Sequence, residues 1–188
     1  MTGERDEGRW SLSVEDLSLS ILDIAENSVN AGASEIRITV IEDKGKDLLD
    51  LVIEDNGTGM DEATARRASD PFFTTRTTRR VGLGLAFLKQ AAQEANGEMR
   101  VESARGKGTK VTARFQASHI DRRPLGDLGG TIKTLVCGYP DIEFIFLYRK
   151  DGVEKRFETK PLRDQLPGGR FASQEGLRIL KQLENWVG

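Results

Sequence analysis

Cysteine, histidine and long apolar runs are almost absent from this sequence of 188 residues. The single cysteine, Cys137, excludes an internal disulfide, and its apolar neighbours indicate a small buried side chain rather than a reactive thiol. His119 is the only histidine, and a lone histidine seldom marks a catalytic or metal site. No stretch approaches the roughly 20 apolar residues of a membrane span, and the first residues lack the apolar core of a secretory signal. We therefore expect a cytoplasmic protein with a disordered tail at residues 1–13.

The net charge is also small. The chain carries 28 Lys and Arg against 30 Asp and Glu, a formal net charge of −2. This balance argues against a protein that holds nucleic acid or another polyanion by bulk electrostatics. We therefore expect neither a nucleic-acid nor a membrane partner. The length suits one domain with a small appendage, or two small domains.

The most informative stretch is residues 19–30, on a helix that we expect to run from about residue 14 to 30. Because each helical residue turns by about 100°, Asp23, Asn27 and Asn30 fall within an arc of roughly 60°, and apolar residues occupy the opposite side. Glu26 lies about 60° from Asp23, at the edge of the polar stripe. An acid and an amide one turn apart suit a hydrated cation or an oriented water. The alternative is the solvated face of an ordinary amphipathic helix.

Residues 14–116 are predicted to form a two-layer α/β unit. Segments rich in β-branched residues predict strands, and the helices are expected to cover one face of a largely antiparallel, four-stranded sheet. The expected strands are residues 35–42, 48–54, 98–103 and 110–115. The expected helices are residues 14–30, 61–68 and about eleven residues that begin near Gly82 and end at Asn96-Gly97.

Residues 127–188, beyond an expected linker at 117–126, are predicted to form a small α-β-β-α appendage. Its expected elements are a helix near 127–137, strands at 142–149 and 153–159, and a helix at about 173–186. The first of these strands is apolar on both faces. We therefore expect the appendage to pack on the first unit along one side and to present an apolar or edge-strand surface to a partner protein on the other. The alternative is a lobe that only completes the core.

Two turns have the composition of a nucleotide site. Asp55 ends a predicted strand and is followed by Gly57 and Gly59. A carboxylate there can accept a hydrogen bond from an exocyclic amine, and the glycines let a flat ring approach the backbone. A second turn ends at Thr109, whose hydroxyl can bond a base edge or a bridging water. For either turn alone, an ordinary hairpin end is the alternative.

A third segment suits phosphate. Gly82-Leu83-Gly84-Leu85 begins a predicted helix, where free backbone N–H groups and the positive end of the helix dipole favour anions. Asn27 offers a neutral oxygen to a Mg²⁺ ion that already has phosphate and water ligands. Since a glycine pair before a helix also serves packing alone, the interpretation rests on the order of the elements.

In that order, the motifs resemble those of the GHKL superfamily, which comprises gyrase, heat-shock chaperone, histidine kinase and MutL ATPases. The resemblance covers about residues 15–116 and is specific. The matching segments are residues 23–33 for the asparagine box in its MutL wording, 55–60 for the first glycine box, 71–76 for the phenylalanine box, 82–85 for the second glycine box and 106–109 for the final motif, the last three in histidine-kinase wording.

The resemblance implies a Bergerat-type α/β sandwich that holds Mg·ATP, with Asn27 on the metal, Asp55 on the adenine amine, and Gly82 and Gly84 at the phosphates. Residues 75–81 correspond to the ATP lid, which is very short here; its arginines reach phosphate or form a solvated basic loop. The other implied nucleotide contacts are Asn30, Gly57, Gly59, Met60, Phe72, Arg80, Leu83, Leu85 and Thr109.

Two departures from the family bear on activity. Hydrolysing and serine-kinase members place a glutamate four residues before the metal asparagine, whereas this chain has Asp23, one methylene shorter. Asp23 is still the candidate catalytic base, and slow hydrolysis or none is the alternative. Histidine kinases also need a phospho-accepting histidine on a dimerising helical hairpin. Only about 13 residues precede the first helix and His119 follows the sheet, so we do not expect a self-sufficient sensor kinase.

We therefore expect a free-standing GHKL kinase that phosphorylates a partner protein in trans, as the anti-sigma-factor serine kinases do, and that can form a homodimer. One alternative is a non-enzymatic ATP switch that binds or releases a partner. Another is a slow ATPase clamp of the MutL type, but such clamps close through long lids and added domains.

Overall fold

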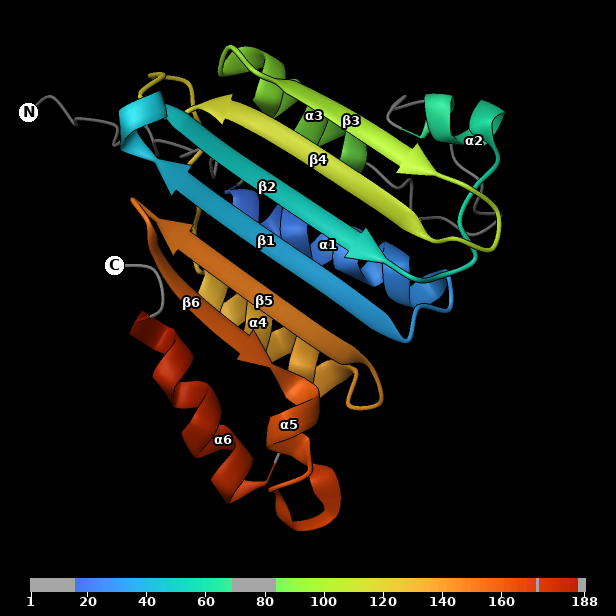
Figure 1. Cartoon of the computed structure of the whole chain (residues 1–188), viewed down its shortest axis with the longest axis vertical. Coiled ribbons are helices and arrows are strands. Elements are labelled where there is room, and N and C mark those ends of the chain that lie inside the picture. Colours follow the sequence, from blue (N-terminus) through green and yellow to red (C-terminus); the bar gives the residue numbers. More distant parts are fainter. Residues whose placement is uncertain (1–15, 69–83, 172, 186–188) are drawn as a thin grey trace, which may run out of the picture.

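The computed structural model describes residues 16–68, 84–171 and 173–185 as a two-layer α/β sandwich (Figure 1). The helices are α1 (Leu17–Asn30), α2 (Glu62–Arg67), α3 (Gly84–Glu94), α4 (Leu128–Gly138), α5 (Thr159–Arg163) and α6 (Gln174–Lys181), with short 3-10 helices at Lys44–Lys46, Pro167–Gly169 and Gln182–Asn185. The strands are β1 (Glu35–Asp43), β2 (Leu48–Asp55), β3 (Glu98–Ser103), β4 (Thr109–Gln116), β5 (Glu143–Lys150) and β6 (Val153–Glu158). The expected tail at 1–13 and lid at 75–81 lie outside the described residues.

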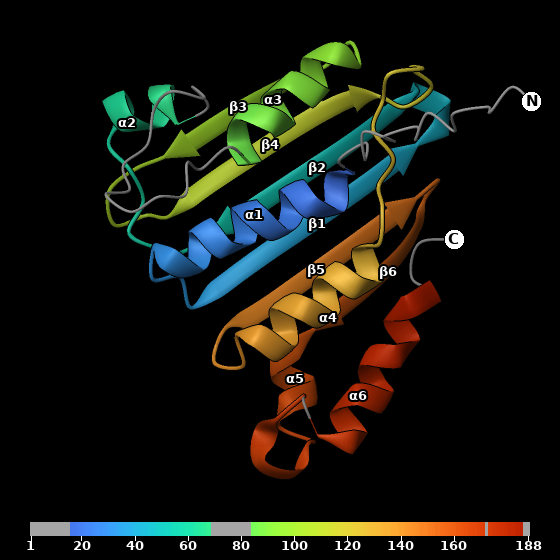
Figure 2. The same cartoon turned by 180° about the vertical axis from the view of Figure 1, so that it is seen from behind.

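The strands of the described residues form one mixed sheet in the order β3-β4-β2-β1-β5-β6. Neighbouring strands are antiparallel except for β1 and β5, which run parallel. Helices α1, α3 and α4 cover one face of the sheet: they lie behind it in Figure 1 and in front of it in Figure 2. The expected α/β sandwich, with a largely antiparallel sheet and helices on one face, is confirmed.

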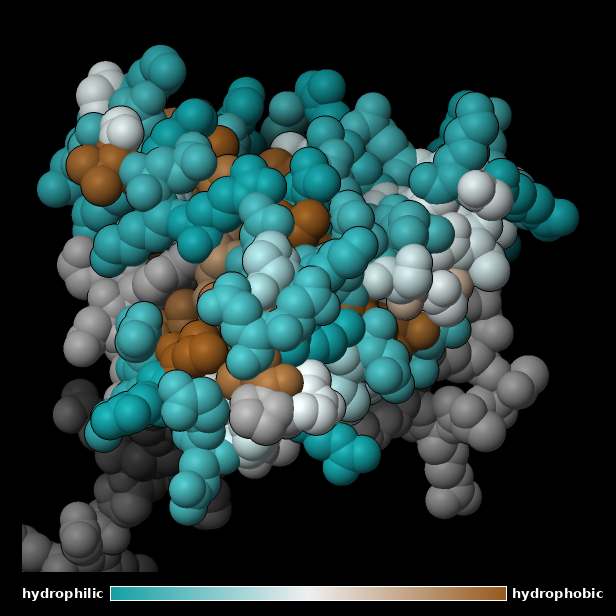
Figure 3. Space-filling model, turned by 60° about the horizontal axis from the view of Figure 1, so that its bottom comes forward, coloured by the Kyte–Doolittle hydropathy of each residue, from teal (hydrophilic) through white to brown (hydrophobic). Residues whose placement is uncertain are grey.

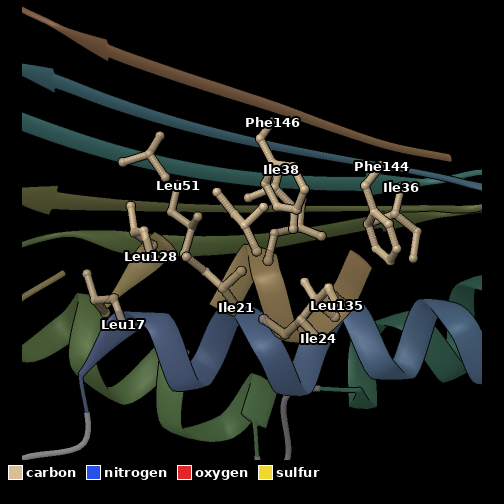
Figure 4. Close-up of a cluster of buried hydrophobic side chains, with 14 of the residues drawn as sticks. Leu17, Ile21, Ile24, Ile36, Ile38, Leu51, Leu128, Leu135, Phe144 and Phe146 are labelled. Atoms are coloured by element: carbon tan, nitrogen blue, oxygen red, sulfur yellow. The ribbon is translucent and has the colours of Figure 1, made fainter. Parts of the chain in front are cut away.

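The core lies between the sheet and the helices. Helix α1 begins after Asp16, whose carboxylate accepts a hydrogen bond from the Leu19 amide at 3.1 Å. The apolar stripe of α1 faces the sheet, and alternate residues of the strands direct their apolar side chains toward the helix. Figure 4 shows the side chains that meet there: Leu17, Ile21 and Ile24 from α1, Ile36 and Ile38 from β1, Leu51 from β2, Leu128 and Leu135 from α4, and Phe144 and Phe146 from β5.

The C-terminal part continues the sheet, which is the main difference from the expected four-stranded arrangement with an appendage. Strand β5 pairs with β1, placing Phe144 opposite Ile36 and Phe146 opposite Ile38. The phenylalanines face the helices, while Ile145 points to the other face and is still only 8% exposed. This strand is apolar on both faces because it is interior, between β1 and β6. The lobe therefore completes the core.

The expected linker at residues 117–126 is fastened to the first part of the chain. The carboxylate of Asp47 accepts hydrogen bonds from the amide of Ser118 at 2.7 Å and from its hydroxyl at 2.8 Å. Further along, the Pro124 carbonyl accepts a bond from the Leu17 amide at 2.9 Å. The connection between β4 and α4 therefore holds the first turn of α1 in place.

The surface is largely polar. Ion pairs join neighbouring strands across the open face of the sheet, from Arg114 to Asp50 and from Lys110 to Glu54, each at 2.9 Å. The view in Figure 3 shows separate apolar areas among hydrophilic side chains. Within the described ranges no helix has the length and apolar character needed to cross a membrane. An apolar partner surface on the lobe stays a prediction.

Removing the lobe should unfold the protein. A chain truncated after Ala117 exposes the edge of β1 and the apolar side chains that α4 and β5 cover, so we expect no cooperative urea transition in circular dichroism. In the full chain, Phe144→Ala should lower the free energy of unfolding by about 3–5 kcal/mol. The control Val153→Ala, at a site that is 67% exposed, should change it by less than about 0.5 kcal/mol. A truncated chain that unfolds cooperatively and binds ATP would show that the lobe is dispensable.

Candidate functional site

The carboxylate of Asp55, at the end of β2, is the best-fixed group of the site. Its Oδ2 accepts a hydrogen bond from the Ser28 hydroxyl on α1 at 2.7 Å. Its Oδ1 accepts bonds from the amides of Gly57 at 2.9 Å and Thr109 at 3.3 Å. Donors from three separate segments thus hold one acceptor group. Because a carboxylate offers about four lone-pair positions, it retains capacity for a further donor.

Two turns pack directly on each other beside Asp55. Gly59 and Gly108 have φ of +64° and +80°, in the left-handed region. A Cβ on Gly108 would lie 1.8 Å from the carbonyl oxygen of Asp55, and a Cβ on Gly59 would lie 2.1 Å from that of Ala104. Only glycine allows this approach, so the turn after β2 and the turn between β3 and β4 pack backbone against backbone.

Ser103, the last residue of β3, joins these two turns. Its Oγ accepts a hydrogen bond from the amide of Met60 at 2.8 Å and donates one to the carbonyl of Gly108 at 2.9 Å. It also lies 3.0 Å from Oγ1 of Thr109. Met60 and Thr109, two expected nucleotide contacts, therefore both contact the Ser103 hydroxyl.

Asp23 lies against the start of α3. A Cβ on Gly84 would lie 2.8 Å from the Asp23 Cβ and 3.1 Å from its Oδ2. Asp23 is exposed and Gly84 is buried, while Leu85 packs against the core. The expected base therefore meets the expected phosphate-binding helix start, and glycine at position 84 permits the contact.

The other polar residues of α1 point in different directions. Asn27 is half-buried, and Asn30 is exposed with its Nδ2 donating to the Glu26 carbonyl at 2.6 Å. Burial, together with the charge and the hydrogen bond of the Glu26 carboxylate, raises the pKa of Tyr139 at the end of α4. Glu26 therefore faces the lobe, whereas Asp23 faces α3.

Part of the expected site lies outside the described residues, namely Phe72, Arg80, Gly82 and Leu83. Their roles stay predictions. The described residues fall into two groups along α1: Asp55, Gly57, Gly59, Met60 and Thr109 gather near Ser28, and Asp23, Gly84 and Leu85 lie at the start of α3, with Asn27 between them on the helix. The amide nitrogen of Asn30 donates to its own helix, and its nucleotide contact stays a prediction.

Sequence reasoning missed three residues of this region, Ser28, Ser103 and Tyr139. The helical angles place Ser28 on the apolar side of α1, where it is 3% exposed. A hydroxyl on an apolar face needs a partner, and that need is the signal that could have identified it. Ser103 fits the alternating pattern of strand β3, and nothing else in the sequence indicates a functional role for it. The contact between Tyr139 and Glu26 joins helices far apart in the sequence, so no local pattern indicates it.

The family model of histidine kinase-, DNA gyrase B- and HSP90-like ATPases matches residues 12–119, more than half of the chain. The chain belongs to this family. It is a GHKL ATP-binding domain, as the motifs indicate. Every group around Asp55 and Asp23 described above lies within the matched residues.

Sensor kinases are among its relatives. The chain is 42% identical over 93 residues to the sensor protein kinase FleS of Pseudomonas aeruginosa, covering 50% of this chain and 23% of FleS. It is 31% identical over 99 residues to the tetrathionate sensor histidine kinase TtrS of Salmonella typhimurium, covering 50% of this chain and 16% of TtrS. The chain thus spans less than a quarter of either relative.

A solved structure supports the fold. The N-terminal domain of a DNA repair protein superposes on this GHKL domain with a TM-score of 0.51 and 18% sequence identity. The superposition covers 75% of this chain and 51% of the other. At this identity the likeness concerns the fold alone.

The described groups fit an adenine nucleotide and Mg²⁺. Asp55 has acceptor capacity for an exocyclic amine. The carboxamide oxygen of Asn27 is a hard ligand of the kind that Mg²⁺ takes beside phosphates and waters. In the described part of the chain, no group of three or more His, Cys, Asp or Glu side chains could hold a metal.

Asp61, the N-cap of α2 beside the site, should stabilise the protein as a charged group down to strongly acidic pH. Hydrogen bonds from Thr64, and then the hydrogen bond and charge of Arg105 at 2.7 Å, lower its pKa to about 2. Because this pKa lies below the ordinary 3.8, the stabilisation is complete above about pH 4 and is lost as the pH falls through about 2. Asp61→Asn keeps a cap acceptor without the charge, so it should reduce the change in melting temperature between these pH values. An identical pH profile in both proteins would contradict the assignment.

Proposed function

We propose that this chain binds Mg·ATP between α1, the end of β2 and the start of α3, and phosphorylates a partner protein in trans. The observation that carries the proposal is the Asp55 carboxylate, held by Ser28, Gly57 and Thr109 beside two closely packed glycine turns. Membership of the GHKL family and the sensor-kinase relatives support ATP as the ligand and phosphoryl transfer as the reaction. The partner protein, magnesium and any homodimer belong to the proposal.

The Asp55 end of the site suits adenine. An ionised carboxylate only accepts hydrogen bonds, so it matches an exocyclic amine and repels a carbonyl oxygen at the same position. The bonds from Ser28 and two amides fix its orientation before any ligand arrives. The site therefore needs little reorganisation to select the amine.

The Asp23 end suits the phosphates. Asn27, which would hold Mg²⁺, lies one helical turn after Asp23 on the same helix. When bound, Mg²⁺ neutralises charge on the phosphate oxygens. The backbone N–H groups at the start of α3 attract anions through the helix dipole. Asp23 is placed to take a proton from a water or a partner hydroxyl.

The same geometry favours a second candidate function, an ATP-dependent switch without turnover. Glu26 is directed to Tyr139 and is therefore not a substitute base. Asp23 is shorter than the glutamate of the hydrolysing family members, which lengthens its distance to a reacting hydroxyl. If transfer is too slow to matter, binding of nucleotide alone would regulate the partner.

Asp23, rather than Glu26, should control any phosphoryl transfer or hydrolysis. We expect Asp23→Asn to reduce turnover by about 10²- to 10⁴-fold, the usual contribution of a general base, with ATP affinity retained. Glu26→Gln, the matched control on the same helix, should change turnover little. Phosphate release and thermal shift with ATP measure the two effects. A loss of turnover in Glu26→Gln alone would reverse the assignment, and faster turnover in Asp23→Glu would support a detuned base.

Asn27 should act through the metal. Asn27→Ala is expected to remove the Mg²⁺-dependent part of the ATP affinity while the melting temperature without ligand stays close to that of the unsubstituted chain, because Asn27 is only half-buried. Titration with ATP in the presence of Mg²⁺ and of a chelator measures this part. Glu26→Gln, on the same helix but directed to Tyr139, provides the control. A variant that unfolds would indicate that Asn27 supports the core instead.

Incubation with γ-labelled ATP tests the proposed function. The purified chain is incubated alone and with lysate of its host, and the label is followed. Label on a partner protein that requires Asp23 supports a kinase acting in trans. Label that stays on ATP in both samples contradicts the kinase and favours the switch, and release as free phosphate by the chain alone indicates an ATPase.

A further inference from the structure

The proton of the Ser103 hydroxyl has a single destination. A serine hydroxyl donates one hydrogen bond and accepts two. The Met60 amide can only donate to it, the Gly108 carbonyl can only accept from it, and the Thr109 hydroxyl can do either. Gly108 is buried, and a buried carbonyl without a donor is unfavourable. Ser103 therefore gives its proton to Gly108 and accepts the bond from Met60.

This fixes the direction of the Thr109 hydroxyl. Because the Ser103 proton is already used, the 3.0 Å contact between the two hydroxyl oxygens is a hydrogen bond only when Thr109 donates it. The lone pairs of Thr109 Oγ1 are then the part left for a ligand. Thr109 is the cross-strand partner of Asp55 and also donates its amide to the Asp55 carboxylate, so the two acceptors lie side by side.

Ser28 donates its proton to Asp55, so the carboxylate still only accepts hydrogen bonds. Its hydroxyl lies 2.7 Å from Asp55 Oδ2 and 3.2 Å from the Ile24 carbonyl. The shorter bond to a charged acceptor is the stronger one, so the proton of Ser28 goes to the carboxylate. Asp55 therefore stays an acceptor toward the ligand.

We propose that Ser103 is a specificity-determining positioning residue, which makes the base end of the site accept hydrogen bonds only and so favours purines with a 6-amino group over those with a 6-oxo group. The inference rests on the proposed nucleotide site. An amine finds acceptors at both Asp55 and Thr109, whereas a 6-oxo purine has only its N1–H to offer to one of them and leaves its carbonyl oxygen beside a group that cannot donate to it.

The test compares binding of ATP and ITP, whose bases differ in the 6-substituent and the N1 proton that follows from it. Ser103→Ala frees the Thr109 hydroxyl to rotate and donate to the 6-oxo group, so we expect the ratio of ITP to ATP dissociation constants to fall by about tenfold. Ser103→Thr keeps the hydroxyl and should restore the ratio. In a Thr109→Val background, Ser103→Ala should leave the ratio as it is, because the group through which it acts is gone.

Each outcome bears on a separate claim. If Ser103→Ala weakens the binding of ATP and ITP equally, so that the ratio of their dissociation constants is unchanged, Ser103 only supports the turns and its role in specificity is overturned. If neither nucleotide binds the unsubstituted chain, the nucleotide site is rejected, and the Ser103 role with it. Should Ser103→Ala fail to unfold cooperatively, Ser103→Cys fills the same space with a weak donor; its ratio should fall in the same direction, and an unchanged ratio overturns the proposal.

Discussion

The hydrogen bond from Ser28 to Asp55 is the contact on which the site depends, because it joins the helix layer to the end of a central strand. Ser28 is 3% exposed, so the loss of this acceptor would leave a polar group buried without its strongest partner. The same carboxylate collects the amides of Gly57 and Thr109. One acidic side chain therefore sets the position of α1, the turn after β2 and the start of β4 relative to one another.

The C-terminal lobe supports this arrangement from the other side of α1. Strand β5 extends the sheet next to β1, and α4 packs beside α1. Tyr139 at the end of α4 engages Glu26, next to the residue expected to bind the metal. The hydroxyl of Thr131 on α4 also approaches the Ser18 carbonyl at 3.4 Å. Helix α1 therefore lies between α3 and α4 and contacts both.

Local features were predictable from the sequence, and contacts between distant segments were not. Alternating residues located the strands, and Asp16 at the N-cap accounts for the start of α1. The grouping of Asp55 with Thr109 followed from the resemblance to a family, since spacing alone allowed ordinary hairpin ends. The parallel pairing of β1 with β5 has no local signal, because three other strands and three α-helices of the described residues separate the two strands along the chain. The hydroxyl groups of Ser28 and Ser103 meet Asp55 and Thr109 only through tertiary packing, which the periodicity of the sequence does not predict.

The central claim is that an adenine nucleotide binds where α1, the turn after β2 and the start of α3 meet. The most direct measurement is a titration of the ¹⁵N-labelled chain with Mg·ATP followed by amide chemical shifts. The account predicts saturable shifts at Gly57, Met60, Thr109 and Gly84, with the amide of Arg114 on the sheet far from the site unchanged. Saturable binding that leaves Gly57 and Thr109 unshifted would contradict it.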